Sequence, residues 1–149
     1  MGDLYVGDRR CGRLDGSGRI LLGEGPSELE AGCASLDGTV TVGRYSSALV
    51  VGGVEGQTVY KGVAPWERST VARFEPDGTV YAGGTRWDEK IVGRVTAPHL
   101  AASAAALVLV AAPAQLENDT SHRAFWESVL SGAIVAAVLR ALRESQPKA

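Results

Sequence analysis

The chain has 149 residues, of which 45% are hydrophobic and 21% charged, and its formal net charge at pH 7 is −2. A chain of this length forms one domain, or one domain with an appended segment, and it can bury a substantial core. Domains that bind phosphate backbones usually carry a strong basic excess, so the charge argues against nucleic acid as a partner. Residues 1–5 lack a basic stretch followed by an apolar run, so we expect no secretory signal and a cytoplasmic location.

One phrase of about twenty residues recurs five times between Asp3 and Pro98, and a fixed period held over several copies indicates a repeat architecture. The first halves alternate like strands and end in glycine: Asp3–Gly7, Arg19–Gly23, Thr39–Gly43, Thr58–Gly62 and Thr79–Gly83. The second halves place a small residue two positions before a large apolar one: Cys11–Leu14, Cys33–Leu36, Val51–Val54, Val71–Phe74 and Val92–Val95. Each copy is therefore expected to contribute two strands.

Acid–glycine pairs join successive copies at Asp37-Gly38, Glu55-Gly56 and Asp77-Gly78, and such pairs supply the positive φ angles of tight hairpin turns. No segment of the repeat is long and helical enough for the crossover that parallel strands need. The sequence thus predicts a mainly β fold with a C-terminal α-hairpin. Residues 1–97 form a five-copy antiparallel hairpin repeat of about ten strands, and closure around a pseudo-fivefold axis leaves no exposed sheet edge.

The two cysteines are interpreted as core residues. Cys11 and Cys33 are aligned with the repeat position that Val51, Val71 and Val92 hold in other copies, so each is expected to be a small buried hydrophobe. A disulfide between them is not required. Because the chain has no Cys-x-x-Cys pair and no histidine near either cysteine, we expect no metal site and no cofactor.

The loops inside copies four and five are related, because Trp66 and Trp87 stand at the same distance past Tyr60 and Tyr81. A repeated tryptophan in a loop is either an exposed binding anchor or a lid that closes one end of the core. The high average burial of tryptophan favours the lid.

Three copies combine a tyrosine in the first strand with an arginine in the second: Tyr5 with Arg13, Tyr60 with Arg73, and Tyr81 with Arg94. If the ring closes, copies four, five and one are neighbours, and these residues form a contiguous aromatic and cationic sector. Two interpretations stay open. The residues are cross-strand cation–π pairs that only stabilise the sheet, or, together with Trp66 and Trp87, they receive an anionic or sugar-like ligand or a partner protein.

The pattern becomes helical after Pro98. Leu100–Ala112 is alanine-rich and uncharged, and we expect it to form a helix that Pro113 stops. A helix that is apolar all round must be buried on all sides. A second apolar helix is expected from about His122 to Glu144, after a polar capping segment.

Residues 98–149 are expected to pack on the repeat, to thread through it, or to contact another subunit. Both apolar runs are shorter than the roughly twenty residues that cross a bilayer, which leaves a membrane hairpin as the less favoured alternative. Ser128, Gly132 and Ala136 form a ridge of small residues on which two helices could meet closely. The amount of apolar helix surface to be covered favours a homo-oligomer.

No catalytic constellation is recognisable. His99 and His122 are the only histidines, and neither has a cysteine or serine partner at a readable spacing. The glycine-rich pieces 15–18 and 51–54 lack the strand-loop-helix setting and the Lys-Ser/Thr ending of a phosphate-binding loop. We therefore expect that the protein is not an enzyme.

The fivefold phrase, a strand with Tyr-x-Gly, a variable loop and Val-Gly-Arg-Val, resembles the short repeats of bacterial β-flower proteins over residues 3–97. That resemblance implies strand pairs around a pseudo-rotation axis and carries no activity or site residue. A barrel around an apolar helix is also similar in outline to the Tubby-like fold, which would imply contact with lipid or a membrane surface. Ten short strands in five equal copies depart from that fold.

The sequence favours a non-enzymatic binding or assembly module that oligomerises or docks through its helices at 98–144. One alternative is a domain that binds a small anionic or sugar-like ligand with the tyrosine and arginine residues of copies four, five and one. The other is a membrane-associated protein that uses the apolar helices.

Overall fold

The computed structural model describes residues 2–23, 28–35, 38–43, 49–62, 65–83, 90–96, 99–117 and 121–145. The strands are β1 (Gly2–Val6), β2 (Arg9–Leu14), β3 (Arg19–Leu22), β4 (Leu29–Ala34), β5 (Thr39–Val42), β6 (Leu49–Glu55), β7 (Thr58–Lys61), β8 (Ser69–Phe74), β9 (Thr79–Ala82) and β10 (Lys90–Val95). The helices are α1 (Leu100–Ala106), a π-helical segment (Leu107–Ala111), α2 (Ala112–Ala114), α3 (Arg123–Leu130) and α4 (Gly132–Ser145), with 3-10 turns at Pro65–Glu67 and Gln115–Glu117.

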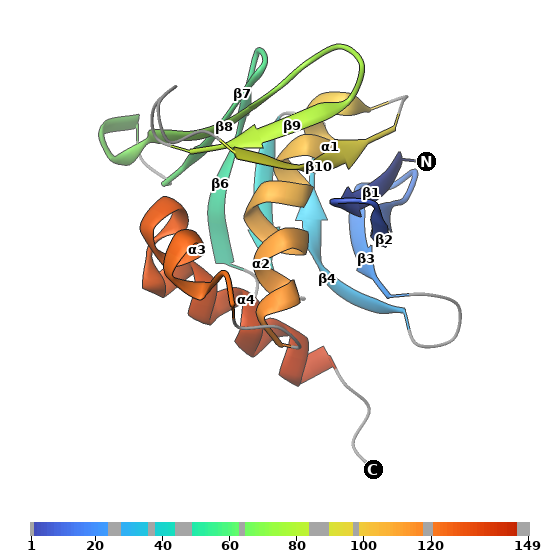
Figure 1. Ribbon diagram of the computed structural model, residues 1–149. Coiled ribbons are helices and arrows are strands. Elements are labelled where there is room, and N and C mark those ends of the chain that lie inside the picture. The colour runs from blue at the N-terminus through green and yellow to red at the C-terminus, as the bar shows by residue number, and fades with distance from the viewer. Residues whose placement is uncertain are drawn as a thin grey trace.

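The ten strands form a closed antiparallel barrel in which each strand pairs with its neighbours in the chain (Figure 1). The barrel closes where β1 pairs with β10, with Leu4 opposite Val95 and Tyr5 opposite Arg94. The prediction of a mainly β fold, closed from about ten antiparallel strands and followed by helices, is confirmed.

Each hairpin formed within a copy carries a register shift at the equivalent place of its first strand, just before Tyr5, Leu21, Thr41, Tyr60 or Tyr81. The residues left without an opposite partner are Cys11, Ala31, Val51, Val71 and Val92, and all five are buried. An extra residue of this kind bends a strand and increases its twist, which helps a short sheet to curl into a barrel.

The residue after each shift must be small. At Gly93 a Cβ atom would overlap the carbonyl oxygen of Tyr5. A Cβ atom added at Gly12, Gly32 or Gly52 would overlap the carbonyl oxygen of a neighbouring strand in the same way. Copy four has Ala72 at this position. The small residue that recurs in the sequence therefore allows the backbone of the next copy to approach closely.

The sequence alignment of copy two is wrong by two residues. The residue of copy two that corresponds to Cys11 is Ala31, and Cys33 instead stands opposite Thr41, at the repeat position of Arg13. Cys33 is half-buried and not a core residue, whereas Cys11 is buried as expected. Ala31 stands eight residues after Gly23, as Val51 stands eight after Gly43, so the alignment on Cys33 makes the loop of copy two longer by two residues than it is.

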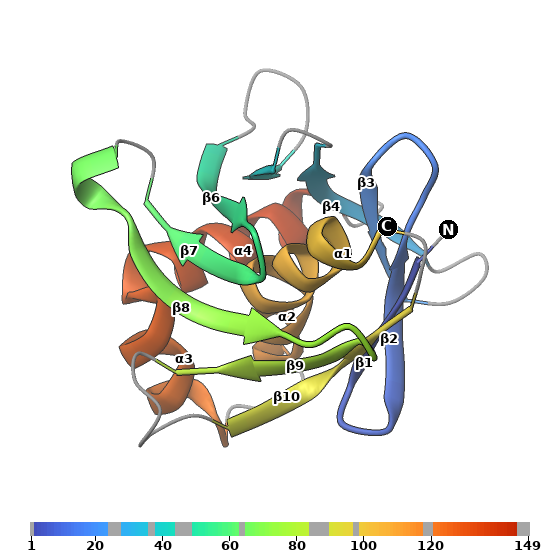
Figure 2. The ribbon, with the colours of Figure 1, turned by 90° about the horizontal axis from the view of Figure 1, so that it is seen from above.

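The alanine-rich helix fills the barrel. It runs without a break from α1 through the π-helical segment into α2 and lies inside the ring of strands (Figures 1 and 2). Residues 104–111 are fully buried, and α1 contacts β1, β2, β4, β6, β7, β8 and β10. Small side chains along α1 allow a helix to fit within a ring of only ten strands.

Pro113 does not stop this helix, contrary to the prediction. It lies inside α2, directly after the π-helical segment Leu107–Ala111. Proline has no N–H to donate, and the π-helical segment changes the hydrogen-bond spacing just before that position. The helix therefore continues to Ala114.

The second predicted helix is in fact two helices, α3 and α4, which bend by 113° at Ser131. Ser131 has φ 86° and ψ 152°, a region that residues other than glycine rarely adopt. The break separates Ser128 from Gly132 and Ala136, so these residues do not form one ridge. α4 packs on β4, β5, α2 and α3. Within the described ranges no single helix is long and apolar enough to cross a membrane, although α3 and α4 together pass that test.

Candidate functional site

Five of the eight predicted site residues lie on the outer surface of five consecutive strands. Tyr60, Arg73, Tyr81, Arg94 and Tyr5 belong to β7, β8, β9, β10 and β1, which are neighbours in the closed barrel. The strand period of two explains their placement, because the residues that flank them in each strand point into the core. In Figure 1, β7 to β10 run across the top of the molecule and β1 lies below β10 on the right.

The arginines stack on tyrosines of the neighbouring copy and not of their own. Arg94 Cζ lies 4.3 Å from the ring centroid of Tyr5, and Arg73 Cζ lies 4.1 Å from that of Tyr81. The predicted pairs Tyr81 with Arg94 and Tyr60 with Arg73 are wrong. The register shift inside each hairpin places the arginine opposite a threonine of its own copy, and the tyrosine opposite it comes from the adjoining copy.

Tyr60 has a different partner, which the sequence analysis missed. Its opposite residue in β6 is Gly53, and the guanidinium of Arg68 covers its ring, with Cζ 4.5 Å from the centroid. Arg68 lies between the 3-10 turn and β8, so strand periodicity gives no signal for it. Three arginine–tyrosine stacks therefore follow one another around this side of the barrel.

Arg13 is engaged elsewhere. Its Nε and Nη2 atoms donate to Glu28 Oε2 and Oε1 at 2.9 and 3.0 Å. The hydrogen bond from Arg13 lowers the pKa of the Glu28 carboxyl, and the same bond raises the pKa of Arg13. Arg13 therefore does not stack on Tyr5 and lies apart from the three stacks.

Trp66 is an exposed residue and not a lid. It sits in the 3-10 turn Pro65–Glu67 and is 84% exposed. It is α4 that packs against the barrel, on β4 and β5, and on the end of the central helix. Trp87, the other predicted tryptophan, lies outside the described residues.

Ile91 adds a second exposed apolar side chain beside the stacks. It is 67% exposed and stands opposite Tyr81 in β9. A sequence reading places it in a strand but cannot tell that it faces outward, because the register shift follows it directly. We call the combined surface the Tyr/Arg face; it consists of Tyr5, Tyr60, Trp66, Arg68, Arg73, Tyr81, Ile91 and Arg94.

The residues of the Tyr/Arg face are exposed or half-buried. None of its residues lines either of the two described pockets, which lie at the two ends of the barrel. Arg73 Nη1 also donates to Glu75 Oε1 at 3.3 Å. Partial burial and the Glu75 carboxylate raise the pKa of the Tyr81 hydroxyl, so Tyr81 stays neutral at neutral pH. At this point the face therefore presents a neutral Tyr81 ring covered by the Arg73 guanidinium.

The described part of the chain contains no cluster of three His, Cys, Asp or Glu side chains that could hold a metal ion. His122 lies at the edge of one pocket and His99 at the edge of the other. Cys11 borders the His122 pocket, but burial raises the pKa of its thiol to about 11 and keeps it protonated. These groups favour binding over nucleophilic chemistry.

Known proteins give no further guide to this arrangement. No protein-family model matches the chain, and searches of the curated proteins and of the solved structures return no match.

Proposed function

We propose that the protein is a non-enzymatic binding module that docks onto a partner protein through its Tyr/Arg face. The observation that carries this proposal is the 84% exposure of Trp66, two residues before the arginine that stacks on Tyr60, at one end of a row of three arginine–tyrosine stacks. Tryptophan, tyrosine and arginine are the residue types that contribute most to binding at protein interfaces. Trp66, and Ile91 opposite Tyr81, are large apolar side chains left exposed, as interaction surfaces often show.

The shape of the face favours a protein over a small molecule. Small-molecule sites are concave and enclose most of their ligand, whereas the largest apolar side chain of this face, Trp66, is 84% exposed. A guanidinium already covers one side of each tyrosine ring, so a sugar or an aromatic ligand has less ring surface to stack on. The stacks also hold rotamers in place before binding, which lowers the entropy lost on association.

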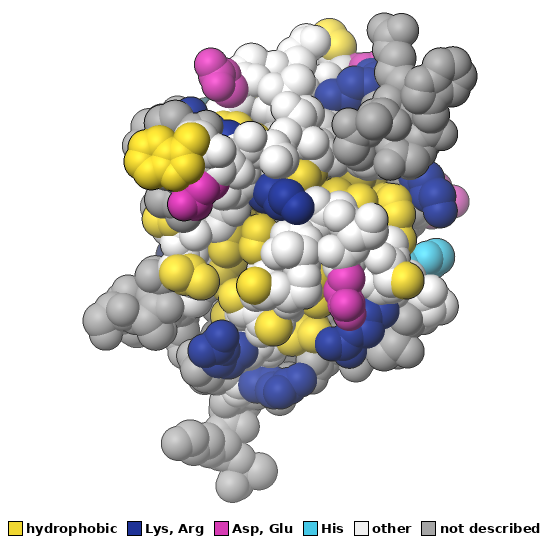
Figure 3. Space-filling view, turned by 90° about the vertical axis from the view of Figure 1, so that its left-hand side faces the viewer, with side chains coloured by type: hydrophobic (Ala, Val, Ile, Leu, Met, Phe, Trp, Pro, Cys, Tyr) yellow, Lys and Arg dark blue, Asp and Glu magenta, His cyan; other side chains and the backbone are white. Residues whose placement is uncertain are grey.

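The charges and apolar side chains of the face indicate which kind of partner surface would match it. Arg68 and Arg94 contribute cations, and Trp66 and Ile91 contribute apolar surface. Figure 3 shows the side of the molecule that lies on the left in Figure 1, with the helices α3 and α4 below the strands; hydrophobic, basic and acidic side chains are mixed on its surface. A matching partner carries an apolar patch with carboxylates around it.

The helices contribute less to this proposal than the sequence suggested. Val135, Val138, Leu139 and Leu142 of α4 are at most 6% exposed, and α4 packs on the barrel and on α3. These four side chains are covered within one chain, which weakens the argument for docking through α4. The barrel surface is the better candidate.

The test compares capture of partner proteins from an extract of the source cells by immobilised full-length wild type and variants. Trp66→Ser and Ile91→Thr should each reduce the amount of the captured partner by about tenfold or more, because truncation of interface anchors costs at least about 1.4 kcal/mol. Leu49→Ser is the matched control, since Leu49 is 54% exposed but lies on β6, outside the face. Arg94→Ala should weaken capture and reduce its salt dependence.

A partner that is captured equally by wild type and Trp66→Ser contradicts the proposal. The remaining explanation is that the face binds a second copy of the chain, and sedimentation of the purified protein over a range of concentrations tests it. Self-association that Trp66→Ser abolishes would replace the partner protein with a second copy of the chain, and would overturn the assignment to a different protein.

A further inference from the structure

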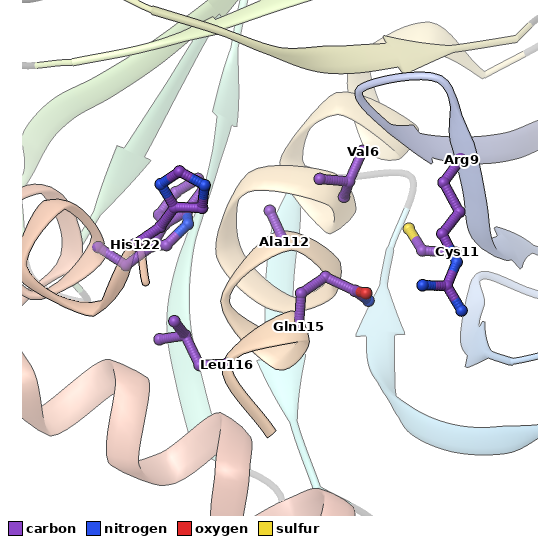
Figure 4. A pocket seen from close by; sticks show the side chains of 8 residues that line it. Val6, Arg9, Cys11, Ala112, Gln115, Leu116 and His122 are labelled. Carbon is purple, nitrogen blue, oxygen red and sulfur yellow. The ribbon is translucent and has the colours of Figure 1, made fainter. Parts of the chain in front are cut away.

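A pocket of about 220 Å³ opens where the central helix leaves the barrel. Its lining residues come from β1, β2, the helix end and α3, and they are Val6, Arg9, Cys11, Ala112, Gln115, Leu116, His122 and Trp126 (Figure 4). The pocket thus joins the first hairpin of the barrel to the helices that follow the repeat. It lies apart from the Tyr/Arg face.

The polar side chains stand around the mouth of the pocket. Figure 4 shows Arg9 and the carboxamide of Gln115 on one side and the imidazole of His122 on the other. Arg9 is exposed at the start of β2 and makes no ion pair with the described residues, whereas its neighbour Arg10 bonds to Asp3 at 3.2 Å. Gln115 Nε2 donates to the Ala111 carbonyl at 3.4 Å, which holds the carboxamide against the helix end.

The floor of the pocket is apolar. Ala112, Leu116 and Trp126 are 2%, 4% and 6% exposed. The ring of Trp126 makes an edge contact with the ring of Phe125. Lys90 Nζ of β10 lies 5.0 Å from the centroid of the Phe125 ring, and together these contacts hold Trp126 in place. The indole therefore forms a fixed wall against which a flat apolar group can pack.

The thiol of Cys11 does not make the pocket reactive. Its Sγ donates to the Leu4 carbonyl oxygen at 3.3 Å, so the hydrogen is directed into the barrel wall. Burial raises its pKa to about 11, and a protonated thiol is a poor nucleophile. The pocket is suited to reversible binding.

We propose that this pocket binds a small organic carboxylate with an apolar body. The carboxylate lies at Arg9, whose planar guanidinium can donate two parallel hydrogen bonds to it, and Gln115 lies on the same side of the mouth. The apolar body packs against Leu116 and Trp126. A fully ionised phosphate would require more than the one permanent cation that the lining provides, so the site selects a single carboxylate.

Benzoate is the probe, because its ring and its carboxylate match the two parts of the pocket. Titration of the full-length protein, followed by calorimetry and by the Trp126 indole N–H signal in NMR, should show binding of benzoate. Benzamide has the same shape without the charge, and it should bind at least about tenfold more weakly than benzoate, because it cannot accept a charged bidentate hydrogen bond. Inorganic phosphate should bind more weakly than benzoate.

Arg9→Gln should weaken benzoate binding by about tenfold or more. Arg10→Gln is the matched control, because it removes the same charge from the next residue and should leave the affinity within about twofold. Equal loss in both variants, equal binding of benzamide, or tighter binding of phosphate overturns the proposal, as does the absence of binding to the wild type. Both arginines lie at least partly in solvent, so an unchanged melting temperature identifies variants that still fold.

Discussion

At the scale of single residues, Asp15 is the side chain whose role is most sharply defined. Its carboxylate accepts hydrogen bonds from the Ser17 N–H and hydroxyl at 2.9 and 2.8 Å, and from the Arg19 N–H and Nε at 2.9 and 2.8 Å. Burial alone would raise the pKa of this carboxyl, but the hydrogen bonds outweigh burial and lower the pKa to about 2. The turn between the first two copies is organised around this one acid.

Replacement of Asp15 by alanine should lower the free energy of unfolding by about 2 kcal/mol at pH 7, because the N–H groups of Ser17 and Arg19 lose a charged acceptor. The pKa is lower in the folded chain than the ordinary 3.8, so this contribution is present above that pH and is lost as the pH falls towards about 2. Urea denaturation between pH 7 and pH 3 measures the change. Asp8→Ala, at an exposed turn, is the control, and a deficit for Asp15→Ala that persists undiminished at low pH would refute this role.

At the scale of elements, the register shifts and the small residues that follow them form the recurring unit of the barrel. Gly93→Ala should lower the free energy of unfolding by roughly 2 to 3 kcal/mol, since its Cβ would overlap the Tyr5 carbonyl oxygen and the strands must separate. Ala72→Gly, at the equivalent position of copy four, should cost only about 1 kcal/mol from lost chain stiffness and packing. Thermal or urea denaturation compares the two. A Gly93→Ala protein as stable as wild type would show that the strands do not approach as described.

At the level of the elements, the sequence predicts the hairpins but not the register of their strands. Strand alternation and acid–glycine turns predict the hairpins because both are local signals. The register shift leaves no such signal, and it is the reason that the predicted Tyr81–Arg94 pair is wrong. The break at Ser131 was missed since serine gives no warning of a positive φ, although the following Gly132 marks a weak point in the helix.

The candidate sites were predicted in part. Outward-facing Tyr5, Tyr60 and Tyr81 follow from the alternation, whereas the stack of Arg68 on Tyr60 and the exposure of Ile91 depend on loop conformation and register. The pocket near Arg9 and His122 brings together residues more than 100 positions apart, so no pattern along the chain announces it. Long-range packing decides which side chains meet.

At the scale of the whole molecule, the barrel and its helix depend on each other. The helix Leu100–Ala114 is too apolar to stand in water, and a ring of ten short strands without it would enclose an empty space. The first and last strands must meet for the Tyr/Arg face to exist, because Tyr5 and Arg94 come from β1 and β10. Closure of the barrel around the helix is thus the claim on which the fold and the proposed function both rest.

Native-state hydrogen exchange tests that closure most directly. The amides of residues 104–111 and the Gly7 N–H, which donates to the Val92 carbonyl at 2.9 Å across the closing strands, are predicted to exchange together with the slowest amides of the protein. They should open only on global unfolding. Fast exchange of residues 104–111, or of the pairing between β1 and β10, while the other strands remain protected, would contradict a barrel closed around a buried helix.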